Sequence, residues 1–238
     1  WKVYRAKFGA VPAAYRMERR GVTINLPVLA ELKSTFTEES AELGGVCVGV
    51  AARMGYTLTL PRAGTNFSLD DFLAWEETQP ERHEYVRGEV FAMMGARRVH
   101  GLVSLNVAAA LKGQLRGSPC RVFNESMKLK AADNALFYPD VFVTCDPADL
   151  RTEQVFTSPT VVVEVLSPST QAYDRGQKFT WYRGMTSLRE YLLVDPDTRE
   201  LQLFRRGADG LFTLHDLTGM PQVDLASIGC SLPAEEIF

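Results

Sequence analysis

The residue most suggestive of chemistry is an acid, Glu164, in the apolar run Val161 to Leu166. The run is short and rich in β-branched residues, which predicts a strand at the centre of a sheet. A buried carboxylate there is strongly destabilising unless a partner replaces its lost hydration. A divalent cation would do so, and so would an arginine at the strand end. Glu164 is therefore either a metal ligand or half of a structural ion pair.

A second carboxylate, Asp140, follows Pro139 in another apolar segment, which we predict to be a strand from Leu136 to Thr144. Alone, a Pro-Asp pair is typical of a turn. On neighbouring central strands, however, Asp140 and Glu164 could converge on one point. Hard oxygen ligands of this kind suit Mg²⁺ or Mn²⁺, so the two acids together predict a metal site.

Asp174, Lys178 and Tyr182 are spaced four residues apart in a predicted helix from Tyr173 to Arg183 and so share one face. One interpretation is a solvated ion pair of little energetic weight. The other is that Lys178 reaches the carboxylates. An ammonium group there could orient or activate a water and offset charge developing on a phosphate.

Three further residues are candidates for a supporting role. Glu84 and Glu89 flank an Arg87-Gly88 turn, and His100 begins a long helix. Either glutamate could face the same cleft and help to hold metal, or be an exposed charge of a hairpin. His100 is either a site residue or a helix-start residue with a satisfied hydrogen bond.

These residues must be positioned by alternating helices and strands. The periodicity and turn signals predict a capped helix after Ser68, a hairpin around Arg87-Gly88, and a mixed set of later elements. The later elements are a helix over 99–115, strands over 121–130, 136–144 and 161–166, a helix over 173–183, a hairpin of 190–194 with 200–205, and an edge strand over 212–217. This order predicts an α/β (α+β) sandwich with a central mixed sheet flanked by helices.

Composition shifts early in the chain. Residues 1–55 are predicted to be a helical N-terminal extension, which we interpret as a fusion or a fragment because the chain begins at Trp1. Residues 56–66 contain Pro61 and Gly64 and are predicted to be a linker. Residues 67–238 are predicted to form one domain.

The overall charge excludes one class of function. The chain has 238 residues, 46% hydrophobic and 23% charged, with a formal net charge of −3. A nucleic-acid binder that works by bulk positive charge is excluded, whereas an enzyme with local basic residues is not. A transmembrane helix is also excluded, since no run of about 18 apolar residues occurs.

The cysteines and histidines are few and scattered. Four cysteines without a CxxC pair favour neither a zinc site nor a dense disulfide framework, and we expect a reduced, cytoplasmic protein. A cysteine hydrolase using Cys145 with a histidine is a weaker hypothesis, because no activating neighbour adjoins Cys145 in the sequence.

Over about residues 67–210 the chain resembles the Uma-two (Uma2) family, bacterial restriction-endonuclease-like proteins of the PD-(D/E)XK nuclease superfamily. The matching segments are Pro139-Asp140, Glu164–Thr170, Asp174 with Lys178 and Tyr182, and Arg189–Asp195. The resemblance implies a divalent-metal-dependent phosphodiesterase core, with Asp140 and Glu164 as its acids. Leu166 stands where the superfamily expects lysine, and Lys178 is the matching position on the following helix.

The resemblance leads to a first hypothesis, a DNA endonuclease. Asp140, Glu164 and a backbone carbonyl near Val165 would hold Mg²⁺ or Mn²⁺, and Lys178 would position the attacking water. Cutting both strands of a duplex usually needs two active sites, so a homodimer is expected by analogy. The alternative is a catalytically silent binding or assembly module with the nuclease fold.

The first 45 residues resemble a different family. The segment Arg16–Asn25 and the Glu/Leu-rich stretch after it resemble the part of family A DNA polymerases that precedes the thumb helices. No palm or fingers accompany this segment, so polymerase activity does not follow.

Overall fold

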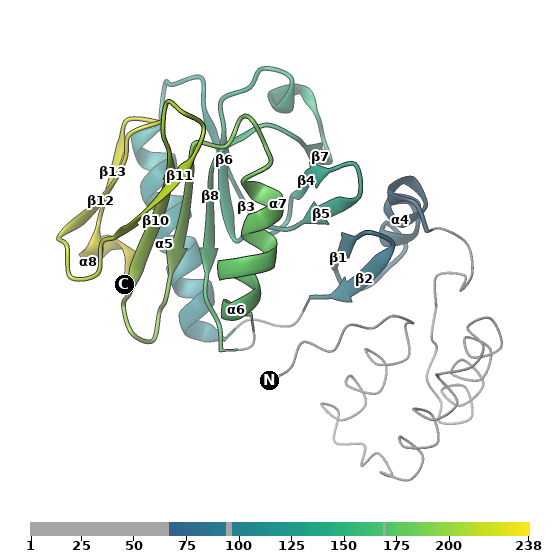
Figure 1. Ribbon diagram of the computed structural model, residues 1–238, viewed down its shortest axis with the longest axis horizontal. Helices are drawn as coiled ribbons and strands as arrows, with labels where there is room; N and C mark the ends of the chain where they lie inside the picture. The colour runs from purple at the N-terminus through teal and green to yellow at the C-terminus, as the bar shows by residue number, and fades with distance from the viewer. Residues whose placement is uncertain (1–66, 94–96, 169) are drawn as a thin grey trace, which may run out of the picture. The chain divides into compact units, whose positions relative to one another are not determined.

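The computed structural model describes residues 67–93, 97–168 and 170–238. The predictions made for residues 1–66 lie outside these ranges. The described residues divide into a smaller unit, residues 67–93, and a larger unit, which holds the described residues from Arg97 onward (Figure 1). Within these ranges, no helix combines the length and the apolar character needed to cross a bilayer.

The smaller unit is a helix followed by a hairpin. Its elements are α4 (Leu69–Glu76), β1 (His83–Val86) and β2 (Glu89–Ala92). Ser68 caps α4 through a reciprocal capping box with Asp71. Arg87 and Gly88 join β1 to β2, and both have positive φ angles, 51° and 85°. Two such residues suit the tight turns of hairpins. The predicted Ser68 cap and the predicted hairpin are both confirmed.

The larger unit is built on a six-stranded sheet. Its strands in spatial order are β11 (Phe212–Asp216), β10 (Leu201–Arg206), β9 (Glu190–Val194), β8 (Pro159–Val165), β6 (Val141–Thr144) and β3 (Arg121–Asn124). Strands β8 and β9 pair in parallel, and the other neighbours pair antiparallel. The sheet is therefore mixed, as the sequence predicts.

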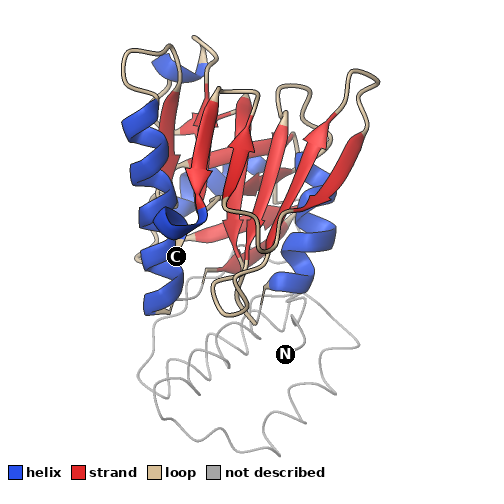
Figure 2. Ribbon diagram, turned by 90° about the vertical axis from the view of Figure 1, so that its left-hand side faces the viewer, coloured by secondary structure: helices blue, strands red, loops and turns tan. Residues whose placement is uncertain are grey.

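Helices cover both faces of this sheet (Figure 2). On one face, α5 (Arg98–Gln114) packs Val107 and Leu111 into a core with Val161 and Val163 of β8. The other face is covered by a helical stretch of three parts, α6 (Gln171–Tyr173), η2 (Asp174–Lys178) and α7 (Phe179–Tyr182). Alternate residues of β8 therefore face different helices. The predicted sandwich is confirmed.

The remaining elements extend this core. Strands β4 (Lys128–Ala132), β5 (Ala135–Phe137) and β7 (Val155–Phe156) pair in a second sheet, and η1 (Asp149–Arg151) precedes β7. Strands β12 (Gln222–Leu225) and β13 (Cys230–Pro233) form a C-terminal hairpin before α8 (Ala234–Ile237). Buried Glu190 accepts hydrogen bonds from the backbone of Ala226 and Ser227 and so ties this hairpin to β9. Neither β7 nor this C-terminal hairpin was predicted from the sequence.

Two predicted strands are each divided between the two sheets. The predicted strand 121–130 breaks after Asn124, where a turn bonds Met127 N–H to the Asn124 carbonyl. The predicted strand 136–144 breaks at Pro139, because proline has no N–H to donate to a ladder. Asp140 consequently lies in the break before β6, and not inside a strand as predicted.

The predicted continuous α-helix 173–183 is also wrong in detail. Residues Asp174–Lys178 form a wider π-helical turn between two short α-helical segments. A π turn holds one more residue than the periodicity of an α-helix assumes, so spacing in the sequence cannot reveal it.

A disulfide joins Cys120 to Cys145, contrary to the expectation of reduced cysteines. The register of β3 with β6 pairs Arg121 with Thr144, so the two cysteines are the next facing pair along these strands. Their Cα atoms are 4.0 Å apart. With its sulfur in a disulfide, Cys145 is no nucleophile, which contradicts the cysteine-hydrolase hypothesis. The cytoplasmic location expected from reduced cysteines stays a prediction.

Candidate active site

Two neighbouring strands bring the predicted acids together. The antiparallel register of β6 with β8 pairs Val141 with Val163, so Asp140 faces Glu164 one step further along. The backbone N–H of Asp140 lies 3.5 Å from Glu164 Oε2. The two acids therefore meet because β6 begins directly after Asp140, beside the end of β8 that carries Glu164.

The lysine of the helical stretch reaches the same point. Lys178 Nζ is 2.9 Å from Glu164 Oε1 and 3.9 Å from Asp174 Oδ1. Tyr182 donates a hydrogen bond of 3.0 Å to Glu164 Oε1. All four residues are buried. The buried charge of Glu164 is thus balanced by an ammonium and a hydroxyl, which is what a stable buried carboxylate requires.

Aromatic rings enclose this polar cluster. The ammonium of Lys178 lies 5.6 Å from the centroid of the Phe137 ring, and that ring contacts Tyr182 edge-on. Tyr191 of β9 donates its hydroxyl to the Asp174 carbonyl at 3.0 Å. Tyr191 was not predicted from the sequence to belong to the site. Its one signal was a tyrosine in an apolar strand, since a buried tyrosine hydroxyl usually needs a hydrogen-bond partner.

His100, from the first turn of α5, contacts the other acid. Its Nε2 lies 3.3 Å from Asp140 Oδ2, and the same oxygen accepts a 2.7 Å hydrogen bond from the Val165 N–H. Burial opposes a charge on His100, but the hydrogen bond to Asp140 and the charges of Asp140 and Glu125 outweigh burial and raise the pKa of His100 above its ordinary value. His100 thus favours its protonated form beside Asp140.

The two predicted supporting glutamates lie in the smaller unit. Glu84 is on β1 opposite Phe91, and Glu89 is on β2 opposite Val86. By this register Glu84 and Glu89 share one face of the hairpin, and both are partly exposed. Their part in the site stays a prediction.

The candidate metal ligands of the site are the carboxylates of Asp140 and Glu164. Among the described residues, no group of three or more His, Cys, Asp or Glu side chains is placed to hold a metal ion. Mg²⁺, however, usually keeps several waters and binds through one or two carboxylates. Asp140 and Glu164 fit that requirement, with the predicted Val165 carbonyl as a further oxygen.

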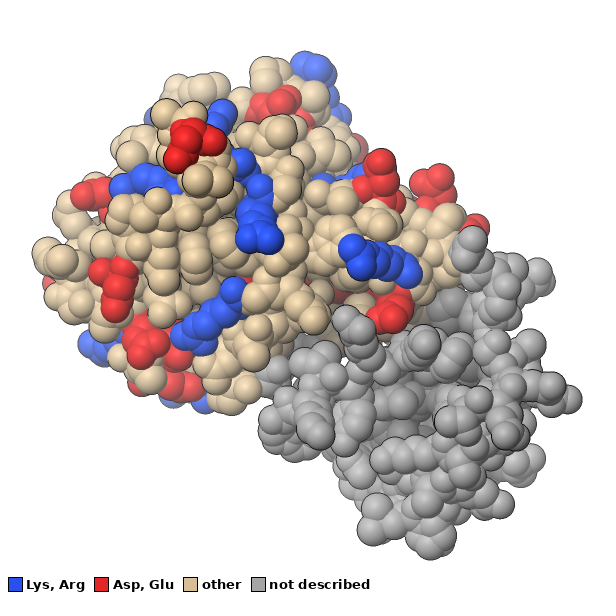
Figure 3. All heavy atoms as spheres, in the orientation of Figure 1, with Lys and Arg blue, Asp and Glu red and all other residues tan. Residues whose placement is uncertain are grey.

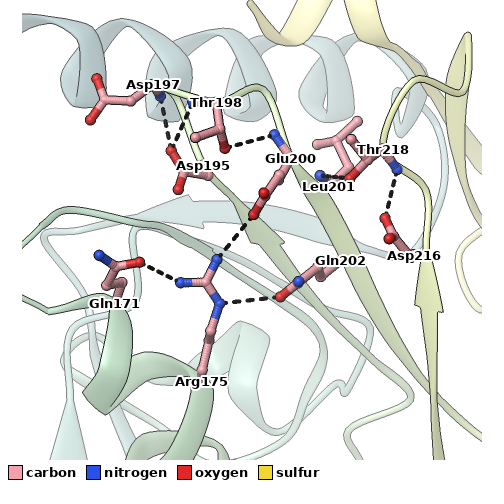
Figure 4. Close-up of polar contacts among 10 residues, drawn as sticks. All are labelled: Gln171, Arg175, Asp195, Asp197, Thr198, Glu200, Leu201, Gln202, Asp216 and Thr218. Atoms are coloured by element: carbon pink, nitrogen blue, oxygen red, sulfur yellow. Dashed lines mark hydrogen bonds and ion pairs between the residues drawn. The ribbon is translucent and has the colours of Figure 1, made fainter.

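Several basic side chains of the larger unit pair with acids. Arg175 bonds to Gln171 at 2.7 Å and reaches Glu200 and Gln202 at the start of β10 (Figure 4). Arg97 pairs with Asp197 in the turn before β10. On the face drawn in Figure 3, positive and negative side chains of the described residues are interspersed. No broad basic surface marks a substrate path on that face.

The chain is similar to known proteins over most of the region that the structure describes. The model of the Uma2 family, described as "Putative restriction endonuclease", matches residues 69–234. The chain belongs to the Uma2 family. Its relatives in Synechocystis include the uncharacterized protein slr1290, 38% identical over 72% of this chain and 90% of that protein. The uncharacterized protein sll1609 is 30% identical over 63% of this chain and 86% of that protein.

A solved structure shares the Uma2 fold seen here. The crystal structure of "a putative nuclease belonging to DUF820" from Anabaena variabilis matches with a TM-score of 0.59. At 18% identity it covers 72% of this chain and 97% of its own. The likeness shows the fold alone. Family and fold together suggest a restriction-endonuclease-like nuclease, whose substrate is nucleic acid.

Proposed function

We propose that the protein is a divalent-metal-dependent endonuclease that hydrolyses phosphodiester bonds in DNA. The observation that carries this proposal is the 2.9 Å contact of Lys178 with Glu164, next to Asp140. The lysine absent from position 166, directly after β8, is supplied by the helical stretch that covers this strand. A purely structural ion pair would not require a second carboxylate at the same point.

Each residue of the cluster has a distinct part in this proposal. Asp140 and Glu164 would hold Mg²⁺ or Mn²⁺, with the Val165 carbonyl. When bound, a divalent cation lowers the pKa of water and polarises a phosphate oxygen. Lys178 orients the attacking water and offsets negative charge on the phosphate. Tyr182 fixes the Glu164 carboxylate by its hydrogen bond.

The surroundings of the cluster favour chemistry on an anionic substrate. Lys178 and His100 each place a nitrogen beside one of the two acids. The negative charge of the acids is thereby partly balanced before a phosphate arrives. We keep a homodimer as part of the proposal, because cutting both strands of a duplex needs two active sites.

The test is cleavage of supercoiled plasmid DNA by the full chain in Mg²⁺ or Mn²⁺. Three variants remove one function each: Asp140→Asn, Glu164→Gln and Lys178→Met. We expect each to lower the cleavage rate by about 10²-fold or more, because each removes a group that acts on the reacting phosphate or water. Asp224→Asn, an exposed acid of β12, is the matched control and should cleave at the wild-type rate.

Other results of the cleavage test would contradict particular parts of the proposal. Cleavage that persists in EDTA would contradict metal dependence, and cleavage that persists in Lys178→Met would remove the lysine from the mechanism. A folded chain that neither cleaves nor binds metal by calorimetry would favour the silent module. Metal binding without cleavage would direct the search to RNA, single strands or branched DNA.

A further inference from the structure

Tyr191, which has no part in the proposed reaction, contacts both ends of the π-helical turn that carries Lys178. Its hydroxyl donates to the carbonyl of Asp174, the first residue of the turn, at 3.0 Å. Its ring stacks on Phe179, the residue after the turn, with centroids 5.0 Å apart and planes 10° apart. Tyr191 is fully buried, so this contact is fixed by packing on all sides.

Tyr191 is also rigidly placed relative to the carboxylate that Lys178 reaches. In the parallel pairing of β8 with β9, Tyr191 faces Val162 and Leu193 faces Glu164. Residues two apart on a strand share a face, so Tyr191 and Glu164 lie on the same face of adjacent strands. A side chain of the sheet thus determines where the covering turn sits above Glu164.

The width of the turn matters for the position of Lys178. A π turn is a rare form, often found at functional sites, and it competes with the ordinary α-helix. Each residue of an α-helix turns the chain by about 100°. Narrowing the turn would therefore rotate Lys178 relative to Asp174 and away from its present direction.

We propose that Tyr191 is a positioning residue: its hydroxyl holds the Asp174 carbonyl and keeps the π turn in the form that places Lys178 Nζ on Glu164. The effect on cleavage rests on the proposed endonuclease function, whereas the effect on the placement of Lys178 does not. Both can therefore be tested separately.

The Tyr191 hydroxyl keeps its proton and so remains able to donate. Burial, followed by the nearby charges of Glu164 and Asp174, raises the pKa of Tyr191 well above its ordinary value. The O–H therefore stays intact over the working range of pH. Tyr191 donates one hydrogen bond and takes no part in proton transfer.

The first experiment measures the exposure of Lys178 without any substrate. The full chain is pulsed with acetic anhydride, and mass spectrometry gives the acetylation rate of each lysine. In Tyr191→Phe, which keeps the ring and removes the hydroxyl, we expect Lys178 to react about fivefold faster, the effect of losing one hydrogen bond on the population of the displaced state. Lys112, Lys128 and Lys130 serve as internal references.

A matched control removes an equivalent hydroxyl elsewhere. Tyr85 is buried and donates to the Phe67 carbonyl at 2.6 Å in the smaller unit. In Tyr85→Phe the reactivity of Lys178 should equal that of wild type. An unchanged Lys178 in folded Tyr191→Phe would overturn the proposal, as would an equal increase in Tyr85→Phe.

Hydrogen exchange on the unaltered protein covers the case in which Tyr191→Phe does not fold. The proposal requires the amides of residues 174–179 to exchange as slowly as those of β9, because the strand anchors the turn. Exchange at the rate of an exposed loop would overturn it.

The catalytic consequence is measured with a double-mutant cycle. Tyr191→Phe should lower kcat for DNA cleavage about tenfold and change KM much less, since every substrate contact other than that of Lys178 is retained. In a Lys178→Met background the same change should have no further effect, because Tyr191 acts through Lys178. Additive losses would indicate a general structural role and overturn the positioning role. A protein that never cleaves DNA fails the endonuclease proposal alone, and the acetylation result still decides the role of Tyr191.

Discussion

At the scale of single residues, Glu164 depends on its partner, because its carboxylate is buried and lies 2.9 Å from the ammonium of Lys178. Removing the ammonium of Lys178 leaves the buried negative charge of Glu164 uncompensated. We expect Lys178→Met to lower the free energy of unfolding by about 3 to 5 kcal/mol, measured by urea denaturation in EDTA. The double variant Glu164→Gln with Lys178→Met should recover most of that loss.

An exposed pair supplies the control for this prediction. Lys130 lies 2.9 Å from Asp133, whose side chain is fully exposed. Lys130→Met should change the free energy of unfolding by no more than about 1 kcal/mol. If Lys178→Met changes the free energy of unfolding as little as Lys130→Met does, the Lys178 ammonium is not what compensates the buried charge of Glu164.

The contact of His100 with Asp140 makes stability depend on pH. The pKa of His100 is above its ordinary value in the folded chain, although burial acts against this, because Asp140 and Glu125 favour the charged ring. The stabilisation is therefore complete below the unfolded pKa and is lost as pH rises through the folded pKa. Compared with His100→Gln in EDTA, the wild type should be more stable at pH 5.5, with a smaller advantage at pH 8.5.

Urea denaturation at the two pH values checks this direction. His215→Gln, on the edge strand β11, is the control, and its difference from wild type should stay nearly constant between them. An advantage of wild type over His100→Gln that grows with pH would contradict the assignment of a raised pKa.

At the scale of elements, the disulfide links β3 to β6, the strand that begins directly after Asp140. The two cysteines are separated by 25 positions in the sequence. Closing a loop of that size should stabilise the fold by about 3 to 4 kcal/mol. We expect dithiothreitol to lower the urea midpoint of the wild type by a corresponding amount.

The double variant Cys120→Ser with Cys145→Ser is the control for this measurement. It should unfold at the same urea concentration with and without dithiothreitol, at about the midpoint of the reduced wild type. A wild-type midpoint that does not respond to the reductant, in a protein whose free thiols include both cysteines, would show that the bond does not form.

The elements also show where sequence patterns stop being informative. A continuous apolar run correctly predicted β8, helical spacing of apolar residues predicted α5, and the turn residues 195–198 predicted the β9–β10 hairpin. Apolar residues also continue across Asn124 and Pro139, where the chain passes from one sheet to the other. Both sheets bury apolar residues, so the pattern does not change at the crossing.

For the molecule as a whole, the sequence predicted the sandwich and the meeting of Asp140, Glu164 and Lys178. That success depended on an unusual signal, a charge in a fully apolar strand, together with a family resemblance. The π turn and Tyr191 could not be predicted in the same way. Their effect depends on the distance between a strand and the helix covering it, and such distances arise only when the sheet is assembled.

The parallel pairing of β8 with β9 has a consequence for the order of events in folding. Two parallel strands cannot be joined by a tight turn, and here their connection, residues 166–189, includes the helical stretch that carries Lys178. Contacts between segments far apart in the chain form slowly. Glu164, Lys178 and Tyr191 therefore meet only once β8 has paired with β9, and we expect a nascent or partly folded chain to lack this cluster.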